Sequence, residues 1–158
     1  MAISCFPPFA NFQFLSAAVS DPLLGLDPSS ERLPSTEIRR LSPAALAYLG
    51  DAIYELHVRR QQLFPPDRLE RYHQRVVRRV CGSAQAKLLL ALLPYLSPEE
   101  QAIVCWGRNG CGRPPRHLPL ADYQNASGLE TILGYLYLTN PDRLRSILAL
   151  TDVLAEMI

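Results

Sequence analysis

The 158-residue sequence lacks the features typical of disulfide-bonded, zinc-binding and membrane proteins. Its four cysteines form no CxxC pair, so we expect no disulfide framework and a reducing, cytosolic setting. Cys105, Cys111 and His117 lack a fourth ligand and the close pair of a zinc site, so we interpret them as core or incidental residues. No uncharged apolar run reaches about 18 residues, which predicts that no segment spans a membrane.

Strand-like alternation of polar and apolar residues is also missing. Apolar residues instead recur at helical spacing from about residue 42 to the end of the chain. We therefore predict an all-α fold. The expected helices cover about residues 43–63, 68–81, 84–93, 98–107, 121–139 and 141–154, with a loop over residues 108–120.

Polar residues just before these segments predict where the helices begin. Ser42 and Ser97 each precede a proline, and Ser97 is expected to form a capping box with Glu100. The other expected caps are Asp67, Ser83 and Asn140.

The first 35 residues differ from the rest of the chain. They contain Pro7-Pro8, Pro22, Pro28 and Pro34 and show no helical or alternating period. No basic segment precedes their apolar residues, so we do not expect a secretory signal. We predict a disordered or loosely docked extension over residues 1–35 and one domain over residues 36–158.

The net charge of +1 conceals a basic middle region. Residues 39–116 contain 13 Lys and Arg against 6 Asp and Glu, an excess of +7. Such an excess suits a protein that binds a phosphate backbone. A solvated helix face explains the charge equally well.

Two acidic residues stand alone in apolar helical segments. Asp51 is surrounded by apolar residues over 44–56, and Glu130 is the one charged residue of segment 127–138. A carboxylate packed against a core loses hydration unless a cation or a donor compensates, so we expect both acids to face one another and share a metal ion. Gly50 beside Asp51 costs the helix roughly 1 kcal/mol relative to alanine, but it opens space next to the carboxylate.

Four motifs resemble the ribonuclease III catalytic domain. They are LAYLGDAIYE at residues 46–55, SAQAK at 83–87, GRN at 107–109 and LETILGYLYL at 129–138. Their order is the family's order, and residues 41–154 are most similar to Mini-ribonuclease III, the short bacterial form without a double-stranded-RNA-binding domain. The resemblance implies a helical bundle of that family.

The resemblance also implies a dimeric, magnesium-dependent endonuclease that cuts double-stranded RNA, such as the 23S ribosomal RNA precursor. Asp51 matches the signature aspartate and Glu130 the glutamate of the second motif, so both are expected catalytic residues and Mg²⁺ ligands. Larger ribonucleases III carry acids where Ala47 and Ser127 stand, but the short form also lacks them. Water or phosphate must then fill the remaining positions around one or two ions.

Seven residues are expected to contact RNA. The arginines after residue 107 point to an RNA-binding loop, although a glycine C-cap with asparagine in a left-handed turn explains Gly107 and Asn109. The start of the helix at residues 83–87 could bind the backbone, or it could be a cap with a solvated face. The expected contacts are Arg108, Asn109, Arg113, Arg116, Ser83, Gln85 and Lys87.

Other polar residues near Asp51 have more than one interpretation. Glu55 lies one turn later, where it could order a metal-bound water or hold an arginine. Tyr48 and Tyr54 are expected to be core aromatics with surface hydroxyls. His57 and His73 are placed among arginines on expected exposed faces and receive no catalytic role.

The apolar character of the helices around Leu49 and Leu133 predicts a C2 homodimer, because cutting both strands of a duplex requires two sites. We expect a cytoplasmic enzyme that processes ribosomal RNA, for which a ribosomal protein is a possible helper. A rival interpretation is a catalytically silent, ribosome-associated RNA-binding module on the same fold, suggested by Ala47 and Ser127. A helical protein-interaction adaptor is a second rival, but it leaves the basic region unexplained.

Overall fold

The computed structural model describes residues 35–38 and 40–158. The extension expected at residues 1–35 lies outside these ranges apart from Ser35. Within them the backbone forms helices and no strand, which confirms the predicted all-α fold. Among the described helices, none combines the length and apolar character that crossing a membrane requires.

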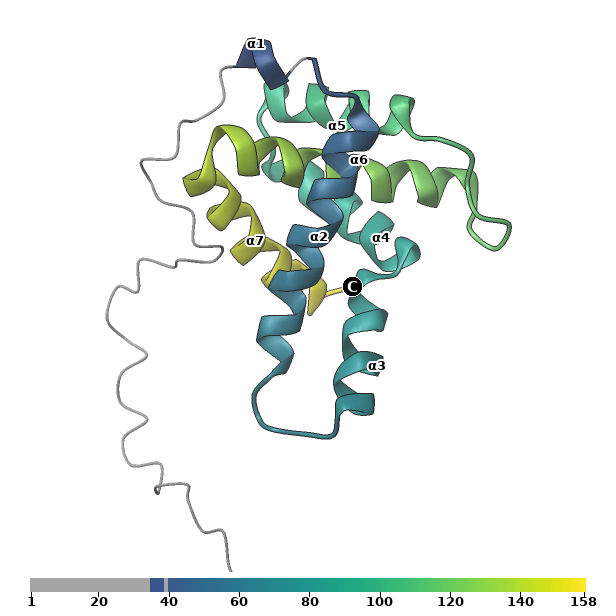
Figure 1. Ribbon diagram of the computed structural model, residues 1–158, viewed down its shortest axis with the longest axis vertical. Helices are drawn as coiled ribbons and strands as arrows, with labels where there is room; N and C mark the ends of the chain where they lie inside the picture. The colour runs from purple at the N-terminus through teal and green to yellow at the C-terminus, as the bar shows by residue number, and fades with distance from the viewer. Residues whose placement is uncertain (1–34, 39) are drawn as a thin grey trace, which may run out of the picture. The chain divides into compact units, whose positions relative to one another are not determined.

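The helices follow one another with short connections (Figure 1). Helix α2 runs down to a loop and α3 returns beside it, and the two are in contact. In chain order the elements are α1 (Ser35–Ile38), α2 (Pro43–Gln62), α3 (Leu69–Val80), α4 (Gly82–Leu92), the 3-10 helix η1 (Leu93–Tyr95), α5 (Pro98–Gly110), α6 (Leu120–Thr139) and α7 (Pro141–Ala155).

Helix α6 forms the centre of the bundle and packs against α2, α4, α5 and α7. Its middle is apolar on nearly every side, which is typical of a helix enclosed by others. Leu129, Ile132 and Leu133 are completely buried. The surrounding helices contribute buried side chains that include Leu46, Leu88, Leu89, Val104 and Ile147.

The backbones of α2 and α6 touch where a glycine of each helix meets the other. A Cβ atom on Gly50 would lie 1.8 Å from the carbonyl oxygen of Glu130, and one on Gly134 would lie 2.1 Å from that of Leu46. No larger residue fits at either position without separating the helices. Gly50 lowers the intrinsic stability of α2, but the close crossing of α2 and α6 requires a glycine there. This crossing brings Asp51 next to Glu130.

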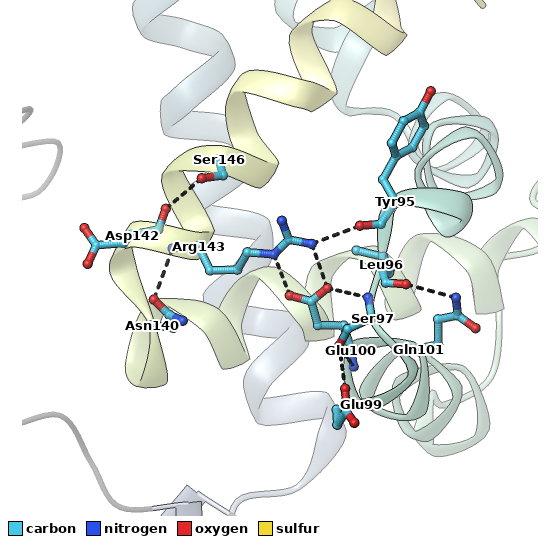
Figure 2. A network of polar contacts seen from close by, with 10 residues as sticks. All are labelled: Tyr95, Leu96, Ser97, Glu99, Glu100, Gln101, Asn140, Asp142, Arg143 and Ser146. Carbon is cyan, nitrogen blue, oxygen red and sulfur yellow. Dashed lines mark hydrogen bonds and ion pairs between the residues drawn. The ribbon is translucent and has the colours of Figure 1, made fainter.

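A charged network fastens the start of α7 to α5 (Figure 2). The Arg143 guanidinium donates to both carboxylate oxygens of Glu100, at 2.7 and 2.8 Å, and to the carbonyl of Tyr95 at 2.9 Å. Glu100 also accepts from the backbone N–H of Ser97 at 2.8 Å. The predicted capping box is thus confirmed, and its glutamate also serves as the anchor for α7.

Two more of the predicted caps are confirmed and two are wrong. Ser42 accepts from the N–H of Ala45, and Asn140 from the N–H of Arg143. Asp67 does not cap α3, because its carboxylate bonds to the Arg68 N–H and to Arg75 instead. Ser83 does not cap α4, which already begins at Gly82, and its hydroxyl bonds to the thiol of Cys81.

Helix α5 is one turn longer than predicted. It continues to Gly110, so Arg108 and Asn109 are helical and the loop covers only residues 111–119. Gly107 is not a C-cap but a packing residue, since a Cβ atom there would lie 2.4 Å from the hydroxyl of Thr131 on α6. The sequence suggested that Gly107 ends a helix. The close contact between α5 and α6 explains this glycine instead.

Candidate active site

Asp51 projects from the outer side of α2, and the prediction that it is buried in a core is wrong for the single chain. The residue is exposed, as are its neighbours Ala52 and Tyr48, whose exposed fraction is 85%. Partial burial of the carboxyl group still raises the pKa of Asp51, a hydrogen bond from Gln85 lowers it, and the charge of Glu55 raises it again. The surface around Asp51 is therefore apolar, but it is open.

Glu130 lies deeper than Asp51 and is half-buried on α6. Burial first, and the negative charge of Asp51 second, raise the pKa of Glu130 to about 8, while a hydrogen bond from Gln85 opposes them. Two carboxyl groups that influence one another in this way lie in a common site. Among residues 35–38 and 40–158, no arginine or lysine lowers the pKa of Glu130, which leaves an electrostatic deficit that a cation would correct.

Gln85 connects the two acids from α4. Its side chain is 1% exposed, and its Nε2 donates to Asp51 Oδ1 at 3.4 Å and to the Val80 carbonyl at 3.0 Å. The Oε1 of Gln85 is buried without a hydrogen-bond partner. This burial contradicts the expected RNA contact, because a side chain in the interior cannot meet a duplex, and the contact with Asp51 leaves Gln85 bound to an acid instead.

The donor set suits a hard divalent cation. Asp51 and Glu130 offer carboxylate oxygens, which Mg²⁺ prefers, and the remaining positions of an octahedral ion are commonly filled by water and phosphate. Across residues 35–38 and 40–158, no group of three or more His, Cys, Asp or Glu gathers in a way that could hold a metal. A site on these two acids alone would therefore depend on oxygens from water and substrate.

The residues expected to contact RNA divide into exposed and packed ones. Asn109, Arg113, Arg116, Ser83 and Lys87 are exposed. Arg108 is half-buried and lies across Gly128 of α6, where a Cβ atom would be 2.9 Å from the Arg108 Cγ. Its Nε is buried with no hydrogen-bond partner. Arg108 thus packs against Gly128, which precedes Glu130 by two residues, whereas the other five residues are at the surface.

The structure decides between the interpretations given above for three neighbours of Asp51. Glu55 holds Arg59, with a contact of 2.5 Å between Glu55 Oε1 and Arg59 Nη2, so the pairing interpretation is confirmed. Tyr54 is 1% exposed, which confirms the expected core position, but the prediction of a surface hydroxyl is wrong because the whole residue is buried. Tyr48 is not a core residue, because it faces outward on the same side as Asp51.

A second polar cluster, which sequence analysis did not find, joins α2, α3 and α7. His57 Nε2 lies 3.1 Å from both carboxylate oxygens of Asp152, and Arg79 donates to Asp152 at 3.0 Å and to Gln61 at 2.7 Å. The expectation that His57 is exposed is wrong, since its side chain is 12% exposed. No local pattern indicates this partner, which is 95 residues away in the sequence.

Comparison with known proteins agrees with this arrangement of helices. A family model described as the Ribonuclease III domain matches residues 44–141. A Mini-ribonuclease 3 from Synechococcus sp. is 52% identical over 129 residues, covering 82% of this chain and 91% of that protein. A Mini-ribonuclease 3 from Thermoanaerobacter sp. is 34% identical over 137 residues, covering 85% and 96%.

A solved structure shows the same fold. The crystal structure of a Fusobacterium nucleatum protein superposes with a TM-score of 0.68 at 27% identity, and the match covers 77% of this chain and 98% of that one. The family match spans both acids and the glycines at which α2 and α6 cross. The chain therefore belongs to the ribonuclease III family, whose members are endoribonucleases, and within it to the Mini-ribonuclease 3 group.

Proposed function

We propose that this protein is a Mg²⁺-dependent endonuclease that cleaves double-stranded RNA, with Asp51 and Glu130 as catalytic residues and metal ligands. The observation that carries the proposal is the uncompensated pair of carboxyl groups, in which burial and the charge of Asp51 raise the pKa of Glu130 to about 8. A site built only for stability would pair such a group with a cation. A bound divalent ion would lower this pKa and stabilise both ionised acids.

Three residues of the chain would position the metal ion and its ligands. Asp51 and Glu130 provide the ligand oxygens, and the Gln85 amide fixes the orientation of Asp51 from the interior. When bound there, Mg²⁺ supplies polarisation of the scissile phosphodiester and a lowered pKa for the attacking water. The apolar flank formed by Tyr48 and Ala52 would limit the access of bulk water once RNA or a second subunit covers it.

RNA would be held by the exposed basic and polar residues on either side of the acids. Duplex RNA is recognised mostly through phosphates, 2′-hydroxyls and groove shape, so these residues need not read bases. Binding should weaken steeply with salt, because phosphate contacts release counterions. The surface contacts in this proposal are Ser83, Lys87, Asn109, Arg113 and Arg116, with Arg108 supporting them from α5.

A homodimer would place two such sites on one duplex. The outward side of α2 exposes Tyr48, Ala52 and Leu56, an apolar strip that a second subunit could cover. A two-fold axis through this strip would present one site to each RNA strand. The match to Mini-ribonuclease 3 proteins supports this arrangement as part of the proposal.

The physiological substrate that we propose is a stem of the 23S ribosomal RNA precursor in the cytoplasm, so the protein would act in ribosome biogenesis. A ribosomal protein that shapes the precursor could help. Incubation of precursor ribosomal RNA with the protein and Mg²⁺, followed by mapping of new 5′ ends, tests this part.

The central experiment is cleavage of an end-labelled RNA duplex with and without Mg²⁺. Asp51→Asn should lower the rate on the order of a thousandfold, because it removes a ligand charge from the site. Glu70→Gln is the matched control, since it removes an exposed carboxylate of α3 and should keep the full rate. Equal rates for wild type and Asp51→Asn would refute the proposal.

One observation favours a second candidate. Ala47 and Ser127 stand where larger ribonucleases III have acids, and Ser127 is buried at 6% exposure. With fewer ligands, the chain could be a silent RNA-binding module on the same fold. Duplex binding without any Mg²⁺-dependent cleavage would establish this alternative.

A further inference from the structure

A basic pocket lies at the start of α4, and its lining does not include Asp51 or Glu130. It has a volume of about 270 Å³ and forms where the end of α3, the beginning of α4 and the end of α7 meet, near the C-terminus in Figure 1. Arg78, Arg79, Ser83 and Lys87 form its polar wall. The side chains that line it include no Asp or Glu.

The positive charge of this pocket is largely uncompensated. Within the part of the chain that the structure describes, the side chains of Arg78 and Lys87 have no hydrogen-bond or ion-pair partner, and both residues are exposed. Arg79 is different, because Asp152 and Gln61 hold its two terminal nitrogens, but its Nε is buried and has no partner. The guanidinium of Arg79 is thus fixed in orientation at the pocket wall.

The backbone adds donors to these side chains. The N-cap of α4 is Cys81, and no side chain caps the helix. The N–H groups of Ala84 and Gln85 bond to the carbonyl of Cys81, whereas the first N–H groups of any helix have no acceptor within it. The first turn of α4 contains no acidic residue. An anion at this end would meet free N–H groups and the positive end of the helix dipole.

The other wall of the pocket is apolar and includes Ala84, Leu88, Ala155 and Ile158. A wall of cations facing a wall of aliphatic side chains matches a ligand that has one anionic end and one less polar end. The volume is near the lower limit of small-molecule sites, which run from about 300 to 1,000 Å³. This size suits a mononucleotide rather than a longer segment of chain.

We propose that this pocket binds the phosphate group of a ribonucleotide, carried either by a free nucleotide or by an RNA strand. Arg78, Lys87 and the start of α4 contact the phosphate, and the sugar lies against Leu88 and Ala155. Ser83 and Lys87 also belong to the proposed RNA contacts, so the RNA-strand case rests on the proposed function. The free-nucleotide case does not.

Titration calorimetry on the full chain without divalent ions tests the pocket directly. The probes are adenosine 5′-monophosphate, inorganic phosphate and adenosine. The two phosphate-containing probes should bind, and adenosine should bind at least about tenfold more weakly, because it lacks the charge that the cations recognise. Equal binding of adenosine and its monophosphate, or no binding of either phosphate probe, would overturn the proposal.

Two arginines of the α3 region form a matched pair of variants. Arg78→Gln should weaken binding of adenosine 5′-monophosphate about tenfold. Arg68→Gln removes the same charge from an exposed arginine about 15 Å away along the helix and should change the affinity by less than about twofold. Equal losses in the two variants would show general charge attraction and would sink the pocket as a site.

The source of the phosphate is separated by competition on the Asp51→Asn chain in the presence of a chelator. If adenosine 5′-monophosphate displaces a fluorescent RNA duplex, and Arg78→Gln removes this competition, the pocket holds a strand phosphate. If the duplex stays bound at saturating nucleotide, the ligand is a free nucleotide. A protein that binds the nucleotide but cuts no duplex refutes only the proposed function, and one that cuts duplex but binds neither phosphate probe refutes only the pocket.

Discussion

Two acidic regions on α2 and its neighbours treat negative charge in opposite ways. Asp152 is in contact with His57, Arg79 and Gln61. Burial acts to raise the pKa of Asp152, but these contacts lower the pKa below its ordinary value. In the part of the chain that the structure describes, Gln85 alone donates a hydrogen bond to Glu130, and the pKa of Glu130 is raised to about 8. Both regions are polar and partly buried, but only the first is neutralised by the chain itself. A charge left unneutralised in the fold marks where a ligand ion belongs.

The largest difference between the regions should appear in catalysis. Glu130→Gln should lower Mg²⁺-dependent cleavage of duplex RNA on the order of a thousandfold, because it removes a proposed ligand charge at nearly constant shape. Asp152→Asn makes the same chemical change in the neutralised cluster and should keep the rate within about fivefold. Initial rates on one labelled duplex compare the two. Similar losses in both variants would show that the effect is general destabilisation.

The pH dependence of stability should separate the regions next. In the protein without metal, Glu130 titrates near pH 4.5 when unfolded and near pH 8 when folded, so its contribution is complete below pH 4.5 and is lost as pH rises to 8. The full shift corresponds to about 5 kcal/mol, and because Glu130 is only half-buried, solvent screening should reduce the loss to on the order of 3 kcal/mol. Urea unfolding from pH 5 to pH 8.5 with a chelator measures it.

Glu130→Gln is the control for this pH dependence, because it has no carboxyl group to titrate. The slope over this range should flatten in the variant and also in wild type with saturating Mg²⁺, which binds only the folded protein. An unchanged slope in Glu130→Gln would place its origin at another group.

Stability at neutral pH should reverse the order of the two regions. Asp152→Asn should destabilise the protein by about 2 kcal/mol, because Arg79 and His57 lose the carboxylate that they bond to. Glu130→Gln without metal should be neutral or stabilising, since burial forces the wild-type carboxyl group to take up a proton at neutral pH, whereas the glutamine amide is neutral in both the folded and the unfolded chain. Denaturant midpoints of the two variants, measured together, decide the matter. Destabilisation by Glu130→Gln would contradict the contrast.

The smallest effect is expected at Gln85. Gln85→Met keeps the volume but removes the amide that reaches Asp51, and it also removes an oxygen without a partner. Stability should change by less than about 1 kcal/mol, whereas the Mg²⁺ concentration for half-maximal cleavage should rise about tenfold. A Mg²⁺ titration of the cleavage rate distinguishes this positioning role, because a merely structural residue would leave that midpoint unchanged.

Local signals predicted much of the fold. The Ser97 and Glu100 box, Ser42 and Asn140 each act within three residues, and the structure confirms them. Asp67 failed as a cap because Arg75, eight residues later, competes for its carboxylate. The prediction that Gly107 ends α5 was wrong, because a glycine is needed there for close packing against another helix. Rules for single helices do not contain such partners.

The site was predictable for a different reason. Two isolated acids on apolar helices, together with the resemblance to ribonuclease III, indicated Asp51 and Glu130 as a pair. The burial of Gln85 and the exposure of Asp51 were not predictable, because both depend on which side of α2 and α4 faces the bundle. The partnership of His57 with Asp152 was hidden by their distance along the chain.

The glycine crossing of α2 and α6 determines how the two acids can vary. Because main chain meets main chain at Gly50 and Gly134, the separation of the Asp51 and Glu130 backbones is set by the helix axes. Surface loops, arginines and even the pocket at the start of α4 can then change in sequence while the spacing between these backbones stays the same. Under the proposed function, substrate preference is therefore free to diverge around a pair of acids whose backbone spacing is fixed.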